Sequence, residues 1–296
     1  MADPSMQLSK YEKREIIIRQ VLDEAEKGKL SPFVENILNG NLDVDQMDAR
    51  GYTAIHLAVW KQETEHIIKL LDKAACPVDL PSGSGQTPLI LAAALGSLQL
   101  IKFFLDRGAD LEIKDNLGMT PLMTAVQNGK LLAYYCLLHR GAKTDAVDKN
   151  GCGVVHWAAY RNQVNMLRVL KLDGFNMNLL DLSGMNCLHR AALSNTVNAV
   201  EYLLFIGVSS EEKDAKGRNV LEIAKENRST GAVACITQFS SDGGPFFQYF
   251  SYLFVFFWMA VYACYQEFVF ESTTDYFILS VLFNFSFLWI IALFVY

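Results

Sequence analysis

A glycine recurs along this chain at a nearly constant interval of 33 residues, and this periodicity constrains the fold more than any other feature. An aspartate precedes five of these glycines by three residues, and an alanine follows all six by seven residues. Such self-similarity is typical of a solenoid, in which each repeat is one small structural unit that packs on its neighbours. The glycines are Gly51, Gly85, Gly118, Gly151, Gly184 and Gly217.

Each recurring residue type has a physical role in the repeat. The Asp-x-x-Gly segment predicts a tight turn, because glycine tolerates a positive φ and aspartate can bond to its own backbone. A short helix should follow, since Thr87-Pro88 and Thr120-Pro121 place an N-cap threonine before a proline at the first helical position. The alanine permits close packing between repeats. A second helix should then end at a further recurring glycine: Gly108, Gly141, Gly174 or Gly207.

This pattern resembles the ankyrin repeat. Thr53–Ala58 reads Thr-Ala-Ile-His-Leu-Ala, close to the family's Thr-Pro-Leu-His-x-Ala signature, and Asn186–Ala191 keeps the histidine. The resemblance covers about residues 20–240 and implies an all-α ankyrin-repeat solenoid whose concave face binds proteins. We interpret 1–45 as an N-terminal helical segment with a capping repeat, in which Ala25 takes the alanine position. Ankyrin repeats then occupy 46–241, and the last segment, 218–241, is expected to be a C-terminal cap.

His56, His156 and His189 share one repeat position, which raises the question of a metal site or a catalytic base. In the resembled family this histidine makes hydrogen bonds between neighbouring turns, and we therefore expect a structural role. The sequence also lacks a Walker A loop, a dinucleotide-binding glycine motif, H-E-x-x-H and G-x-S-x-G. No catalytic, cofactor-binding or metal-binding residue is predicted in this chain.

Four residues are candidates for contact with a protein partner: Tyr52, Trp60, Tyr160 and Arg161. Trp60 lies two residues after Ala58, where the first ankyrin helix faces the concave groove, and Tyr160 is its equivalent three repeats later. Tryptophan, tyrosine and arginine are the residues most enriched at binding hot spots. The alternative is that all four are ordinary exposed solenoid residues. Trp157, which follows His156, is expected to pack in the core.

Composition excludes some partners and points to others. The net charge of −6 gives no general attraction to nucleic acid. None of the six cysteines forms a C-x-x-C pair, and we interpret them as reduced thiols of a cytosolic domain. Residues 245–266 and 276–296, by contrast, are 22 and 21 residues long and uncharged. Each is long enough to cross a bilayer as a helix, which predicts a transmembrane hairpin; a buried helix pair is the alternative.

An ankyrin array followed by paired membrane helices resembles the ankyrin-repeat protein S-acyltransferases, or palmitoyltransferases. His156–Ala159 and Asp214–Ala224 are similar to that family's later repeats. The resemblance implies a substrate-recruiting half with a cytosolic array at the Golgi or another endomembrane. It implies palmitoyl-CoA and zinc only for a full-length acyltransferase. This chain contains no Asp-His-His-Cys motif, and Cys264 in the first span does not replace it, so acyl transfer by the chain itself is not expected.

Two other classes fit an array beside a membrane. An ankyrin-bearing cation channel usually has a longer linker than the few residues around 240–244, which argues against that class. A non-enzymatic membrane scaffold is the third interpretation. Because the chain stops at the edge of its second predicted span, we expect a truncated product, and the sequence that follows Tyr296 would discriminate among the three classes.

Overall fold

The computed structural model describes residues 21, 24, 27 and 29–241 of the 296-residue chain. The chain divides into two compact units, Met1–Val233 and Ala234–Tyr296, and the described part of the second unit is the end of one helix. Within these described residues every regular element is a helix, and β pairing is limited to an isolated bridge between Met47 and Thr53. The prediction of an all-α fold is therefore confirmed for this part of the chain.

The helices come in pairs. The first helices of the pairs are α3 (Ala54–Trp60), α5 (Pro88–Leu95), α7 (Pro121–Gln127), α9 (Val154–Tyr160), α11 (Cys187–Leu193) and α13 (Val220–Glu226). The second helices are α4 (Thr64–Asp72), α6 (Leu98–Asp106), α8 (Leu131–His139), α10 (Val164–Leu172), α12 (Val197–Phe205) and α14 (Thr230–Ser241). Before the first pair lies α2 (Ser31–Leu38), which buries Phe33, Val34 and Ile37.

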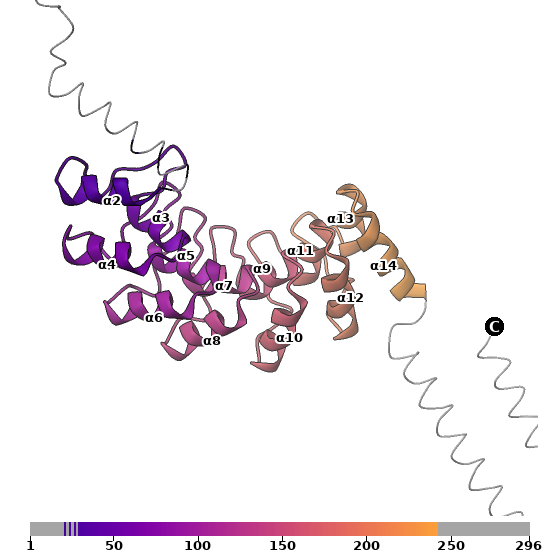
Figure 1. Ribbon diagram of the computed structural model, residues 1–296. Helices are drawn as coiled ribbons and strands as arrows, with labels where there is room; N and C mark the ends of the chain where they lie inside the picture. The colour runs from indigo at the N-terminus through magenta and orange to yellow at the C-terminus, as the bar shows by residue number, and fades with distance from the viewer. Residues whose placement is uncertain (1–20, 22–23, 25–26, 28, 242–296) are drawn as a thin grey trace, which may run out of the picture. The chain divides into compact units, whose positions relative to one another are not determined.

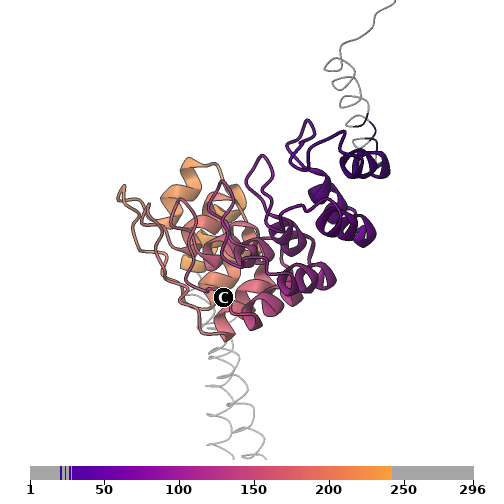
Figure 2. The ribbon, with the colours of Figure 1, turned by 90° about the vertical axis from the view of Figure 1, so that its left-hand side faces the viewer.

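Successive pairs stack into a solenoid. Each first helix from α3 to α11 packs on the first helix of the next pair, while second helices such as α6 and α8 form a row of their own. Figure 1 shows the two rows, with the loops between repeats projecting from the row of first helices. After a turn of 90°, Figure 2 shows these loops projecting on the same side. We call the surface made by the first helices and these loops the inner face.

The recurring alanine lies where consecutive first helices approach each other. Its side chain is 0% exposed in all six copies. A small side chain suits such a contact, because added volume in a close-packed interior strains the packing around it. The predicted packing role is thus confirmed for Ala58, Ala92, Ala125, Ala158, Ala191 and Ala224.

The turn aspartates bond to the backbone that follows them, as predicted. Oδ1 of Asp148 accepts hydrogen bonds from the backbone N–H groups of Asn150 and Cys152, both at 2.8 Å. The other four turn aspartates make the same pair of bonds. Gly118, three residues after Asp115, has a φ of +87° and returns its N–H to the carbonyl of that aspartate. Such a φ disfavours any residue with a Cβ.

The predicted helix boundaries are also present. The hydroxyl oxygens of Thr87 and Thr120 each accept a backbone N–H three residues on, at 3.3 Å, with proline at the start of the helix. After the second helices the chain reverses through glycines whose φ lies between +83° and +92°. These are Gly108, Gly141, Gly174 and Gly207.

Some predictions fall outside the described residues. Ala25, Cys264 and the two predicted spans, 245–266 and 276–296, are among them. In the part of the chain that the structure describes, no helix is both long and apolar enough to cross a membrane.

Candidate functional site

The three signature histidines connect neighbouring repeats. Nε2 of His56 lies 2.8 Å from the carbonyl oxygen of Gln86 in the next repeat, and its Nδ1 lies 2.7 Å from the hydroxyl of Thr53. His156 and His189 reach the carbonyl oxygens of the next loop in the same way. Burial lowers the pKa of His56 to about 4 and also lowers the pKa values of the other two. The histidines are therefore neutral structural groups, as the resemblance implied.

The four predicted contact residues occupy two parts of the inner face. Trp60 is the last residue of α3 and is 60% exposed, and Tyr160 at the same position of α9 is 38% exposed. Arg161, which follows Tyr160, is exposed. Tyr52 is half-buried in the first turn, and the guanidinium of Arg50 lies 5.8 Å from its ring centroid.

These four residues do not form one cluster. Tyr52 and Trp60 belong to the repeat that contains α3, whereas Tyr160 and Arg161 lie at the end of α9. Two further first helices, α5 and α7, separate the two groups along the stack. A partner that contacts both groups must therefore extend along several repeats.

Trp157 is the residue that sequence reasoning placed wrongly. It is only partly buried rather than part of the core, and it lines a pocket of about 230 Å³ on the inner face. Its ring meets that of Tyr160 edge to face, with 5.7 Å between centroids and 82° between planes. The other residues that line this pocket are Asp148, Asn150, Cys152, His156, Arg190 and Leu193. We call it the Trp157 pocket.

The residues at equivalent positions give no consistent signal of this outcome. The residue at this repeat position is Leu57 in the first repeat, Thr124 in the third and Arg190 in the fifth. Leu57 and Thr124 are buried, whereas Trp157 and Arg190 are only partly buried. The exposure of this position therefore varies from repeat to repeat, and repeat spacing alone does not fix it.

One wall of the Trp157 pocket is a buried ion pair. Nε and Nη2 of Arg190 lie 2.7 Å and 2.5 Å from Oδ2 of Asp181, whose side chain is 0% exposed. The thiol of Cys152 lies 3.7 Å from the same oxygen. Burial raises the pKa of Cys152 to about 12, so this thiol stays protonated and is a poor nucleophile. The wall therefore offers charge and shape rather than covalent chemistry.

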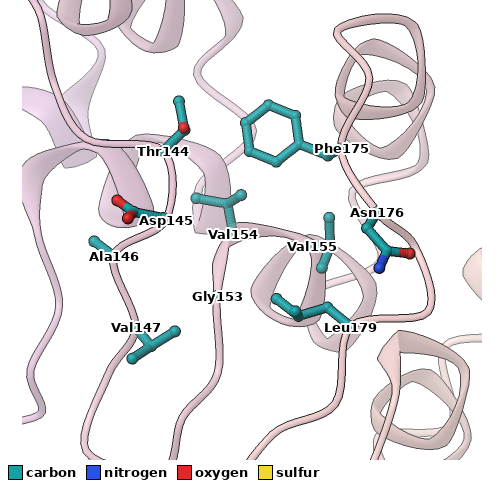
Figure 3. Close-up of a pocket in the computed structure, with 10 residues that line it drawn as sticks. All are labelled: Thr144, Asp145, Ala146, Val147, Gly153, Val154, Val155, Phe175, Asn176 and Leu179. Carbon is teal, nitrogen blue, oxygen red and sulfur yellow. The ribbon is translucent and has the colours of Figure 1, made fainter.

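A second pocket, of about 220 Å³, is lined by residues of the loop 144–147, the start of α9 and the loop 175–179. Figure 3 shows the side chains of Val154, Val155, Phe175 and Leu179 around it. Its lining includes none of the described polar atoms that are buried without a hydrogen-bond partner, whereas the Trp157 pocket includes two. The Trp157 pocket is therefore the better candidate for recognition of a polar ligand.

Among the described residues, no group of three or more histidine, cysteine, aspartate or glutamate side chains is placed to hold a metal ion. The comparison with protein families finds one family model, described as ankyrin repeats (3 copies). It matches the overlapping ranges 22–115, 66–148, 94–181, 122–214 and 155–238, which together cover well over half of the chain. A comparison with curated proteins found no match.

Proposed function

This chain belongs to the ankyrin-repeat family, and from that premise we propose that its inner face binds an extended segment of a partner protein. Ankyrin arrays are protein-binding modules, and stacked repeats create long surfaces suited to that task. The observation that carries the proposal is the pair of large aromatic side chains, Trp60 and Tyr160, exposed at the same position of two first helices. Exposed tryptophan and tyrosine anchor protein interfaces far more often than their abundance predicts.

We further propose that the chain is anchored in a membrane. The support is the sequence of 245–266 and 276–296, two uncharged stretches of spanning length. The array would then face the cytosol, at the Golgi or another endomembrane. The lipid bilayer is in this proposal a second partner, besides the protein bound by the inner face.

We propose, as the enzyme context, that the chain is the substrate-recruiting part of a protein-cysteine S-palmitoyltransferase. The support is the order of array and apolar stretches together with the local similarity of His156–Ala159 and Asp214–Ala224. In such an enzyme the array holds the substrate protein near the catalytic domain and raises its effective concentration there. Palmitoyl-CoA and zinc would belong to that catalytic domain.

The binding proposal is tested with peptides selected by display against the full-length protein in detergent. Affinities are then measured by fluorescence polarisation for the wild type, Trp60→Ala, Tyr160→Ala and the control Leu132→Ala. Leu132 is 67% exposed on α8, in the row of second helices. Each inner-face variant should weaken binding about tenfold or more, while the control should not. Equal affinity across all four proteins would refute the use of this face.

The other two proposals have separate tests. Alkaline carbonate extraction of cell membranes should leave the full-length chain in the pellet, and its release into the supernatant would contradict membrane anchoring. The coding sequence beyond Tyr296 tests the enzyme context. A cysteine- and histidine-rich segment with Asp-His-His-Cys would support the acyltransferase. Four further spans with a pore loop would support a cation channel instead. An in-frame stop codon would support a non-enzymatic membrane scaffold.

A further inference from the structure

Three turn aspartates have their second carboxylate oxygen neutralised by an arginine of the chain. Oδ2 of Asp48 lies 2.9 Å from Nη2 of Arg50, and Oδ2 of Asp214 lies 2.6 Å from Nη2 of Arg218. Asp181 pairs with Arg190 in the pocket wall described above. A buried carboxylate needs such a partner, because an unpaired charge away from water is costly.

Asp148 lacks this partner. It is only 6% exposed, and its Oδ2 is buried without a hydrogen-bond partner. The arginines that serve the other aspartates come two, four or nine residues after them. The corresponding positions after Asp148 carry Asn150, Cys152 and Trp157, none of which is cationic, and all three line the Trp157 pocket.

The neighbouring repeat shows that a missing arginine alone does not create this situation. Asp115 also has no arginine at the three positions, which hold Leu117, Met119 and Thr124. Its second oxygen, however, is not among the described polar atoms that are both buried and unpartnered. Asp148 is thus the turn aspartate, within the described repeats, at which the chain leaves a buried acceptor without a donor.

A donor beside Asp148 is also unpartnered. Nε1 of Trp157 is buried without a hydrogen-bond acceptor, and this residue lines the same pocket as Asp148. The pocket therefore combines a carboxylate oxygen that needs a donor with an indole N–H that needs an acceptor. A buried polar group without a partner is costly, so a ligand that satisfies both atoms gains hydrogen bonds that the free protein leaves unmade.

We propose that the Trp157 pocket is a recognition subsite for one arginine side chain of a bound protein segment. The guanidinium takes the place that Arg50, Arg190 and Arg218 occupy in their own repeats, and donates to Oδ2 of Asp148. The indole N–H of Trp157 donates to a backbone carbonyl of the same segment. This inference rests on the proposed function, because it assigns one contact within the inner face.

The size, rings and charge of the pocket agree with this occupant. Its volume of about 230 Å³ is below the roughly 300–1,000 Å³ of sites that hold whole small molecules, and suits a single side chain. The rings of Trp157 and Tyr160 offer faces and edges to a planar cation. Arg190 is already paired with Asp181, whereas Oδ2 of Asp148 has no hydrogen-bond donor.

Arginine fits better than lysine for a geometric reason. Its planar guanidinium can donate to Asp148 while it stacks on a ring, whereas an ammonium presents a compact, strongly hydrated charge. Because Oδ2 of Asp148 and Nε1 of Trp157 are both covered in this structure, binding also requires the Trp157 ring to move. That movement provides an optical signal.

The test is a titration of the full-length protein, in detergent, with the peptide acetyl-Gly-Ala-Arg-Ala-Gly amide, followed by tryptophan fluorescence. The same peptide with citrulline, which is neutral and nearly isosteric, and the same peptide with lysine are the comparisons. We expect the arginine peptide to change the emission and to bind about tenfold or more tightly than the citrulline peptide. Trp157→Phe should remove the emission change.

Two protein variants complete the design. Asp148→Asn keeps the side-chain oxygen that organises the turn but removes the charge, and should weaken the arginine peptide about tenfold or more. The matched control Asp115→Asn makes the same change in the preceding repeat and should leave affinity unchanged. Far-UV circular dichroism verifies that both variants fold. The citrulline comparison on the wild type needs no variant.

The outcomes separate this inference from the wider proposal. Equal binding of arginine and citrulline peptides, no binding up to millimolar concentration, or unchanged affinity in Asp148→Asn would each overturn the subsite. Equal binding of lysine would overturn its assignment to arginine. If display-selected peptides depend on Trp60 but not on Asp148, the inner-face function stands and the subsite fails. If peptide binding depends on Asp148 but not on Trp60 or Tyr160, the arginine subsite stands and the proposal for the wider inner face is refuted.

Discussion

Acidification should destabilise the solenoid through His56. The ring is buried between repeats, where Nε2 donates to the carbonyl of Gln86 and Nδ1 contacts the hydroxyl of Thr53. Burial favours the neutral ring and lowers its pKa from the ordinary value of 6.5 to about 4. Between these two pH values the unfolded chain binds a proton that the folded chain does not. The stabilisation is thus complete above pH 6.5 and is lost as the pH falls toward 4.

The size of the effect follows from that shift. One pKa unit corresponds to about 1.4 kcal/mol, so the shift to about 4 corresponds to about 3 kcal/mol at most. Integration of proton uptake from pH 7 to pH 5 assigns about 2 kcal/mol of this loss to His56 alone. His156 and His189, whose pKa values are also lowered by burial, add to the loss in the same direction.

The assay is urea unfolding followed by far-UV circular dichroism at pH 7 and pH 5. It compares the wild type with His56→Gln, whose amide can still donate to the Gln86 carbonyl but does not titrate. The wild type should lose about 2 kcal/mol more than the variant over this interval, because the other two histidines are common to both proteins. An equal loss in the two proteins would refute the burial argument for His56.

Three further changes should lower the free energy of unfolding in the same assay. Thr120→Ala removes an N-cap acceptor and should cost about 1 kcal/mol; no change would contradict the capping role. Gly118→Ala should lower the free energy of unfolding more than Gly108→Ala does, although both glycines have a positive φ. A Cβ at Gly118 would lie 2.8 Å from the backbone nitrogen of Lys149, whereas a Cβ at Gly108 would meet no atom within 4 Å. Equal costs would show that φ strain alone matters. Ala158→Leu overfills a 0% exposed contact between first helices and should cost about 1–3 kcal/mol; a neutral result would mean that the helices can separate.

The candidate site shows how far the position of a residue within the repeat predicts the exposure of its side chain. The exposed positions of Trp60 and Tyr160 could be predicted, since both follow the buried alanine by two residues on a helix. The position of Trp157 could not, because the equivalent residues are as different as Leu57 and Arg190. A large side chain there is buried only as deeply as the next repeat allows, and neighbouring repeats differ.

The sequence by itself determined the elements of the solenoid. Its turns, caps and helix ends depend on hydrogen bonds between residues two to four apart, such as those from Asp148 to the next backbone N–H groups, and such bonds can be inferred from spacing. Only the tertiary structure decided which buried carboxylates are neutralised. Arg190 forms an ion pair with Asp181, which precedes it by nine residues in the sequence. Trp157 follows Asp148 by the same number of residues, and Oδ2 of Asp148 has no hydrogen-bond partner. Charge pairing depends on side-chain direction and burial between repeats, and neither is encoded in residue spacing.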